Sequence, residues 1–259
     1  MSAPTPAPPT RDDPPRPPWG LGEVAVAAVV TLFVSALLGS LVLSAAGEES
    51  SEDASLVVVA LITATLWVGM LGSVLVVLRR RGGTLRDDLG LRFRAGDALL
   101  GLALGVAGQL ILVPVVSWPW VRLLGENVDE LQEPACRLAD KADDPVGVAI
   151  LFLVTVVGAP LVEELFFRGF VQRAAVARLG RVLGVVLTAV LFGLTHFQLL
   201  QLPALVAFGL VLGIMADRTG RLGLNVVTHM AFNATTVVSL VVLSSADAQC
   251  RDVLGMVWP

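Results

Sequence analysis

The chain has 259 residues, of which 55% are hydrophobic and only 15% are charged, and its formal net charge is −4. Soluble domains carry about 25% charged residues, so this composition excludes a soluble globular protein and indicates a polytopic membrane protein. The chain has only two histidines, His196 and His229, and both fall in apolar segments.

Residues 1–20 are predicted to form a disordered, cytoplasmic tail, because eight of the fifteen prolines lie within residues 1–18. Proline-rich sequences favour extended polyproline conformations that build no packed core. A solvated linker is the simpler interpretation, and a partner-binding segment is the alternative.

Seven apolar runs follow, and they predict an all-α fold, a polytopic transmembrane helix bundle, with eight spans as an alternative count. A helix needs about 20 residues to cross the hydrocarbon core. The fifth and sixth runs are shorter, which favours tilted or re-entrant helices. Pro160 is predicted to kink the fourth run. The runs are approximately Leu21–Ala46, Leu56–Leu78, Ala98–Val116, Val146–Leu179, Val182–Phe197, Leu202–Met215 and Leu222–Leu243.

Basic residues are distributed unequally between the loops. Thirteen of the eighteen fall in the N-terminal tail or in the loops after the second, fourth and sixth runs. The positive-inside rule therefore predicts a cytoplasmic N-terminus and an external C-terminus. The arginine-rich, lysine-poor composition indicates a bacterial plasma-membrane protein. In this topology Cys136 and Cys250 are both external, where a disulfide between them would persist; two free thiols are the alternative.

The fourth run carries an unusual cluster of charges, in the sequence PLVEELFFRGFVQR of residues 160–173. Ionisable residues inside a membrane are costly and mark function by default. Glu164 and Arg168 are four residues apart on one helix face, so we expect them to form a structural ion pair. Glu163 is turned about 100° away from Glu164 and is therefore the unpaired carboxylate.

Two further polar sites interrupt later runs. Phe192 and His196 are four residues apart in the fifth run, and His229 and Asn233 are four apart in the seventh. Each histidine alone is compatible with a hydrogen-bonded packing residue. Phe192 is interpreted as packing behind its histidine. Asn225 extends the stripe of His229 and Asn233 by one more turn, and a helix cap is its simpler interpretation. Two histidines, an unpaired glutamate and an asparagine together exceed what helix packing requires.

These residue types suit the hydrolysis of an amide bond. A glutamate shielded from water becomes a better base, and it can deprotonate a water molecule held jointly with a histidine. A second histidine and a carboxamide can donate hydrogen bonds to the oxyanion that forms. The sequence contains no G-x-S-x-G and no H-E-x-x-H motif. Zinc bound by Glu163, His196 and His229 stays open as an alternative.

In this order the three motifs resemble the CAAX protease and bacteriocin-processing family of intramembrane proteases, also called the ABI family. The motifs read EELFFR (163–168), FGLTH (192–196) and HMAFN (229–233). DDLGLR (87–92) is similar to a cytoplasmic segment that often precedes the family's domain. The resemblance covers about residues 146–245 and implies helices enclosing a polar cavity near the middle of the membrane.

By this resemblance, Glu163 is the general base and His196 helps it to activate water. His229 and Asn233 then form the oxyanion site. The family is often labelled metalloprotease, but we favour water activation without an obligatory metal. The implied partners are membrane lipid and a membrane-associated or lipidated peptide; a nucleic acid is not expected.

The runs and the resemblance divide the chain into the tail (1–20), accessory spans with a basic cytoplasmic loop (21–96), a third span with an acidic external loop (97–145), the catalytic core (146–245) and an external tail (246–259). One alternative function is a non-proteolytic scaffold or a bacteriocin self-immunity protein that uses the same cavity for binding. A proton-coupled transporter is less favoured, because the sequence lacks paired halves.

Overall fold

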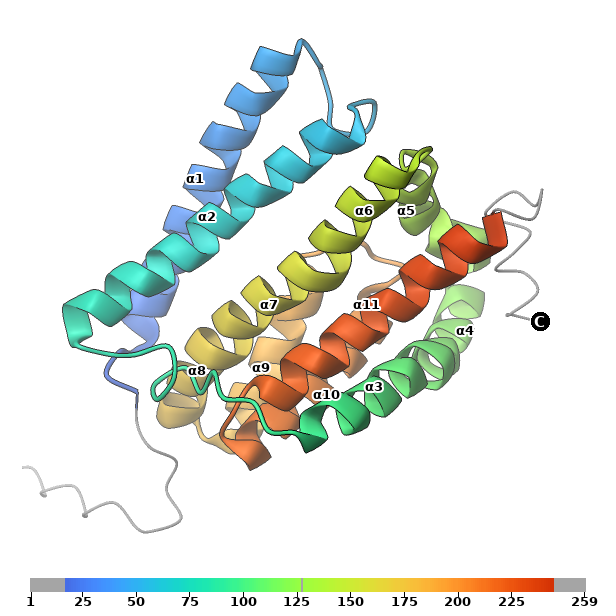
Figure 1. Cartoon of the computed structure of the whole chain (residues 1–259). Coiled ribbons are helices and arrows are strands. Elements are labelled where there is room, and N and C mark those ends of the chain that lie inside the picture. The colour runs from blue at the N-terminus through green and yellow to red at the C-terminus, as the bar shows by residue number, and fades with distance from the viewer. Residues whose placement is uncertain (1–16, 127, 245–259) are drawn as a thin grey trace, which may run out of the picture.

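A computed structural model describes residues 17–126 and 128–244, and within these ranges the chain forms helices and no strand (Figure 1). The predicted all-α fold is therefore confirmed. The α-helices are α1 (Leu21–Ala46), α2 (Leu56–Arg81), α3 (Gly96–Ala107), α4 (Val113–Leu124), α5 (Val128–Asp140), α6 (Pro145–Leu151), α7 (Ala159–Glu163), α8 (Gln172–Leu179), α9 (Arg181–Leu194), α10 (Leu202–Thr219) and α11 (Gly223–Ser244). Three π-helical stretches, Gly108–Leu112, Phe152–Gly158 and Glu164–Val171, join α3 to α4, α6 to α7 and α7 to α8.

Within the described residues, six helical segments are long and apolar enough to cross a membrane, and α9 is a shorter apolar helix. Each of the seven predicted runs corresponds to one of these segments. The longest continues for 35 residues, from Pro145 to Leu179, and it passes Pro160 as helix rather than breaking there. Many large apolar side chains of α1, α2 and α3 are exposed on the outer surface, as expected for helices that face lipid.

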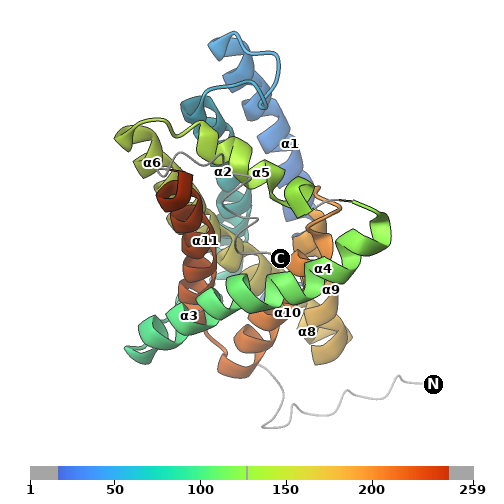
Figure 2. The ribbon, with the colours of Figure 1, turned by 90° about the vertical axis from the view of Figure 1, so that its right-hand side faces the viewer.

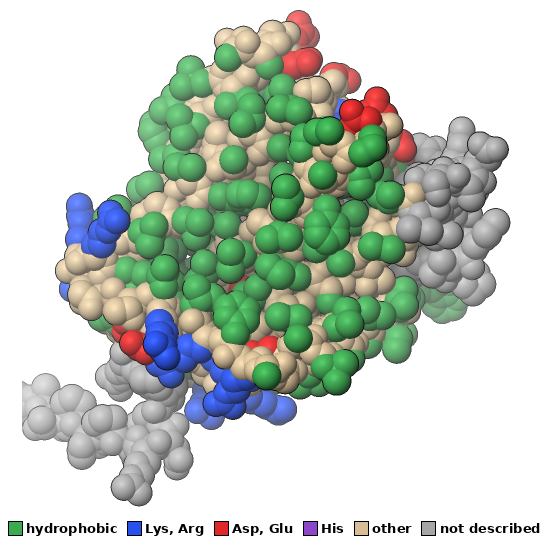
Figure 3. All heavy atoms as spheres, viewed as in Figure 1, with side chains coloured by type: hydrophobic (Ala, Val, Ile, Leu, Met, Phe, Trp, Pro, Cys, Tyr) green, Lys and Arg blue, Asp and Glu red, His purple; other side chains and the backbone are tan. Residues whose placement is uncertain are grey.

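The two ends of the bundle carry opposite charges, as Figure 3 shows. The basic end contains the end of α2, the start of α3, the end of α10 and the start of α11. Two ion pairs lie there, Arg81 with Glu23 and Arg221 with Asp97. Acidic side chains gather at the opposite end, around the α1–α2 loop. This separation is what the positive-inside rule uses. The cytoplasmic location of the N-terminus stays a prediction.

Backbone hydrogen bonds from residues 222 and 223 to the segment 87–92 hold the start of α11 in place at the basic end. The N–H of Leu222 donates to the carbonyl of Gly90 at 2.8 Å, and the N–H of Gly223 donates to the carbonyl of Arg92 at 3.0 Å. Gly90 has a φ of +75°, and a Cβ there would lie 2.3 Å from the Arg173 side chain. Only glycine fits this close approach without strain.

The acidic stretch after the third predicted span is largely helical, because α4 runs on to Leu124 and α5 follows. Leu131, Ala135 and Leu138 recur at helical spacing and form one apolar face of α5, with Leu131 buried. The hydrogen bond and the charge of Glu133 raise the pKa of Arg137 on the outer face. Figure 2 shows α5 lying across the acidic end, between α4 and α6.

The structure bears on two predictions made for the ends of the chain, the disordered N-terminal tail and the cysteine bridge. Trp19, at the end of the segment predicted to be disordered, is buried, and its Nε1–H donates to the carbonyl of Phe170 at 3.0 Å. Cys136 is buried on α5. Cys250 lies outside the described residues, so the bridge between the two cysteines stays a prediction, which a mobility shift on reduction would support.

The contact between α3 and α11 depends on glycine. A Cβ on Gly105 would lie 2.4 Å from the carbonyl oxygen of Thr228 and 2.5 Å from the Cβ of Ala231. We expect Gly105→Val to lower the free energy of unfolding by about 3 kcal/mol, because the backbones must separate. Gly72→Ala is the matched control, since its Cβ would meet nothing within 4 Å; it should stabilise α2 by up to about 1 kcal/mol. Equal effects of the two variants on unfolding in detergent would contradict this account.

Candidate active site

The long helix loses its regular hydrogen bonding just before the two glutamates, and α11 uses the carbonyl that this leaves free. In the π-helical stretch 152–158 the N–H of Ala159 donates five residues back, to Val154. In the same register the carbonyl of Thr155 would need the nitrogen of Pro160, which carries no hydrogen. The side-chain Nδ2 of Asn233 donates to that carbonyl instead, at 2.7 Å. Asn233 is thereby fixed beside the helix that carries both glutamates.

Glu164 is completely buried and accepts hydrogen bonds from three side chains. Arg168 Nη1 lies 2.9 Å from Glu164 Oε1, which confirms the predicted pair. His229 Nδ1 lies 3.0 Å from the same oxygen, and Asn225 Nδ2 lies 3.2 Å from Oε2. A buried carboxylate is tolerable only with such compensation. Glu164 therefore binds one of the predicted catalytic histidines as well as the arginine.

Asn225 was interpreted from the sequence as a helix cap, and the structure corrects this. Its side chain is fully buried and donates to Glu164 and, at 2.7 Å, to the carbonyl of Leu212 on α10. The available signal was its position four residues before His229, which puts both side chains on one face of α11. The partner of Asn225, Glu164, is 61 residues away in the sequence, so helical spacing could not identify it.

The helix predicted to run through Phe197 ends at Leu194, and His196 lies in the turn that follows. The carbonyl of Phe192 accepts hydrogen bonds from the hydroxyl of Thr195 and from Nδ1 of His196, each at 2.8 Å. These side chains replace the backbone N–H that would continue the helix. Phe197 then takes a left-handed φ of +54°, which stops the helix. Because a carbonyl only accepts, Nδ1 of His196 carries the proton, and its Nε2 is left as an acceptor.

His229 has a matching arrangement. Its Nδ1 faces the Glu164 carboxylate, which holds a proton on that nitrogen, and its Nε2 lies 3.7 Å from Glu163 Oε2. That distance exceeds a direct hydrogen bond. His229 is therefore placed between the Glu163 and Glu164 carboxylates.

Phe192 does more than pack behind His196. Its ring centre lies 4.9 Å from that of His196 and 5.8 Å from that of His229, and the Arg168 guanidinium carbon lies 4.2 Å from the ring centre. A cation over an aromatic face is an attractive contact. Phe192 thus fixes both imidazoles and shields the buried ion pair.

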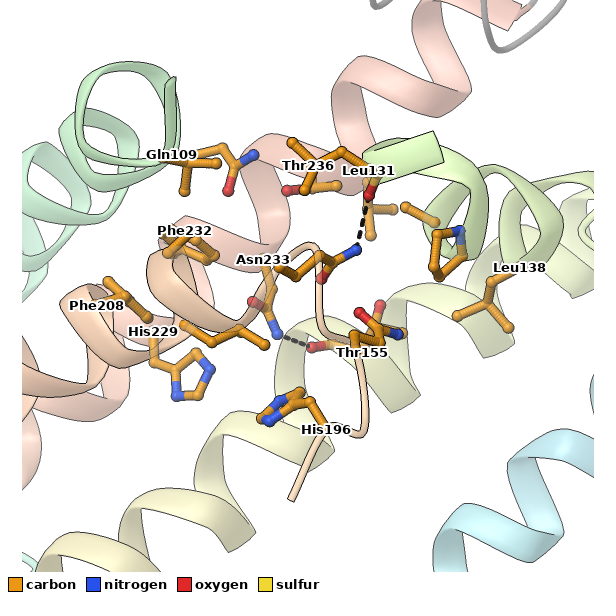
Figure 4. Close-up of a pocket in the computed structure, with 18 of the residues that line it drawn as sticks. Gln109, Leu131, Leu138, Thr155, His196, Phe208, His229, Phe232, Asn233 and Thr236 are labelled. Carbon is orange, nitrogen blue, oxygen red and sulfur yellow. Dashed lines mark hydrogen bonds between the residues drawn. The ribbon is translucent and has the colours of Figure 1, made fainter. Parts of the chain in front are cut away.

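Glu163, His196, His229 and Asn233 all line one cavity of about 370 Å³. Figure 4 shows His196, from the turn after α9, and His229 and Asn233, both from α11, converging on it. The Glu163 side chain is 21% exposed, whereas that of Glu164 is fully buried behind it. The convergence expected from the motifs is therefore present in the geometry. The catalytic role of each residue stays a prediction.

The proposed zinc ligands do not form a metal site in this arrangement. Across residues 17–126 and 128–244, no three His, Cys, Asp or Glu side chains are placed to hold a metal ion together. The Nδ1 contacts of His229 and His196 leave both Nε2 atoms open, so it is the placement of the donors that disfavours a shared ion. The donors do not fit the group, so no step of the mechanism proposed below passes through a metal.

Comparison with known proteins identifies the segment that contains these residues. Residues 145–235 match a family model described as type II CAAX prenyl endopeptidase Rce1-like. No curated protein and no solved structure matches the chain. The matched segment runs from the start of α6 into α11 and includes all three motifs. This segment is therefore similar to the type II CAAX prenyl endopeptidase family over residues 145–235.

Proposed function

We propose that this protein is an intramembrane endopeptidase that hydrolyses a peptide bond of a membrane-associated or lipidated peptide. The observation that carries the proposal is the cavity shared by Glu163, His196, His229 and Asn233 inside an apolar bundle. Low polarity strengthens the electrostatic contacts that such a site makes with a reacting group.

The reaction begins with water held between Glu163 and Nε2 of His196. The Glu163 carboxylate takes one proton, and the hydroxide oxygen attacks the carbonyl carbon of the scissile bond. Glu163, now a carboxylic acid, gives that proton to the amide nitrogen as the carbon–nitrogen bond breaks. The products are a new carboxyl terminus and a new amine, so the water is fully accounted for.

The oxyanion formed by the attack needs donors, and α11 supplies two. In the proposed step His229 donates through Nε2, while its Nδ1 is held by Glu164. Asn233 uses one amide hydrogen on the Thr155 carbonyl, and its second is free for the oxyanion. Each such donor is worth about 10²- to 10³-fold in kcat.

The test uses the full chain in proteoliposomes with internally quenched peptides that have an apolar core, in lipidated and unlipidated versions. We expect new termini by mass spectrometry with the wild type and none with His196→Ala. Cleavage by neither protein, together with wild-type cellular phenotypes of the same variant, would favour the scaffold or immunity function.

The same assay tests the metal hypothesis. We expect full activity after treatment with 1,10-phenanthroline, because the proposed steps use only side chains. Loss of activity that added Zn²⁺ restores would instead support zinc bound by Glu163, His196 and His229.

A further inference from the structure

The half of the cavity away from the catalytic residues is built largely from segments outside the family match. Gln109, Val113 and Ser117 line it from the helix that joins α3 to α4, each four residues after the last. Leu131 and Leu138 of α5 line it from the acidic end. None of these five residues lies within 145–235. On α11, the lining extends from His229 to Leu240, which is about 16 Å of helix.

The hydroxyl of Ser117, in this wall of the cavity, is buried without a hydrogen-bond partner among the described residues. The side chain as a whole is fully buried. A serine in a helix usually donates to the carbonyl one turn back. Ser35 and Ser239 do so, at 2.6 and 2.8 Å. A buried hydroxyl without a partner costs stability, so a ligand that supplies one offers a physical reason for it.

Gln109 provides the second polar group. It lies in the π-helical stretch 108–112, a type of distortion that is frequent at functional sites. Figure 4 shows Gln109 and Thr236 at one end of the cavity and His196 at the other. No hydrogen bond joins the Gln109 carboxamide to another described side chain or backbone group. A carboxamide offers one acceptor and two donors, the same groups that a peptide main chain pairs with.

We propose that Gln109 and Ser117 bind the main chain of the substrate, and that the substrate is an uncharged, apolar peptide segment. This inference rests on the proposed function for the position of the scissile bond. The remaining wall is mostly apolar, with Val113, Leu131 and Leu138, and so suits apolar side chains. An extended peptide rises about 3.4 Å per residue, so the 16 Å wall accommodates about five residues on one side of that bond.

The test measures binding separately from cleavage. A fluorescent peptide with an apolar core is titrated into Glu163→Gln protein in nanodiscs, and the Kd is compared with that of Gln109→Leu and Ser117→Ala made in the same background. We expect each variant to weaken binding about 3- to 10-fold, the effect of one neutral hydrogen bond. Gln109→Asn, which keeps the carboxamide on a shorter side chain, should lose less than Gln109→Leu.

A backbone-ester series locates the contact. Each amide N–H of the peptide is replaced in turn by an ester oxygen. One replacement should weaken binding to the parent protein and leave binding to Gln109→Leu unchanged, which is the signature of a direct pair in a double-mutant cycle. If every ester weakens the parent and Gln109→Leu equally, and no variant changes the Kd, the proposal is wrong.

Stability separates binding from folding. Ser117→Ala removes an unpartnered buried hydroxyl, so its Tm should be equal to or above that of the parent. Ser40→Ala is the control, because Ser40 is exposed on α1 and donates to Ala36; it should leave the Kd unchanged. Binding that depends on Gln109 and Ser117 without cleavage by the wild type would defeat the proposed function only. Cleavage without any change in Kd would defeat this inference only.

Discussion

Replacement of Glu163 by Gln should lower kcat/KM by about 10³- to 10⁴-fold while the protein still accumulates in the membrane. General base catalysis contributes up to about 10⁴-fold, and a carboxamide cannot take the proton from water. Glu163 lines the cavity, and Glu164 makes the direct ion pair with Arg168, so we expect the variant to fold. Initial rates with the internally quenched peptide in proteoliposomes measure the loss.

Glu130→Gln is the matched control for this variant. Glu130 is exposed on α5, outside the membrane-spanning helices, and the same change there should leave kcat/KM within about twofold. Residual activity in Glu163→Gln at more than about a tenth of the wild-type rate would mean that another group activates the water. The proposed mechanism would then be wrong.

Replacement of Arg168 by Met should lower the free energy of unfolding by about 3–5 kcal/mol. The Glu164 and Arg168 side chains are both 0% exposed, so the change leaves a carboxylate buried with its main countercharge removed. It also removes the cation over Phe192 and the hydrogen bond from Nη2 to the carbonyl of Gly209 at 3.3 Å. Thermal unfolding of the purified protein in detergent, followed by tryptophan fluorescence, measures the loss.

The double variant Glu164→Gln/Arg168→Met separates stability from activity. Without a buried charge, it should recover most of the stability that Arg168→Met loses, since an ion pair replaced by neutral groups is often tolerated. It should remain inactive, because His229 Nδ1 loses the Glu164 carboxylate that orients its ring. If the two single losses simply add, the pair does not act as a unit and this account fails.

Much of the fold could be predicted because membrane insertion is encoded locally. A run of apolar residues must form a helix in lipid, since every backbone N–H and carbonyl needs a partner there. The predicted run Leu21–Ala46 therefore coincides with α1, and the start of Leu56–Leu78 coincides with that of α2. The Glu164–Arg168 pair was also predictable, because both residues lie one turn apart on the same helix.

Local pattern failed where a helix end depends on contacts with other side chains. The apolar run continues through Phe197, but α9 ends at Leu194, where the side chains of Thr195 and His196 both bind the carbonyl of Phe192. The α5 helix was missed for a related reason. Its acidic outer face resembles a loop in composition, and its apolar face is stable only against the cavity wall that it covers.

The sequence by itself determined that this chain spans a membrane as a helix bundle, and which three motifs carry its ionisable and amide side chains. Only the tertiary structure decided that His229 faces Glu164, that Asn225 supports that carboxylate, and that the Ser117 hydroxyl has no partner within the described residues. The physical reason is separation along the chain. Hydrophobicity and helical spacing act between neighbours, whereas Asn225 and Glu164 are 61 residues apart and meet only once the helices have packed.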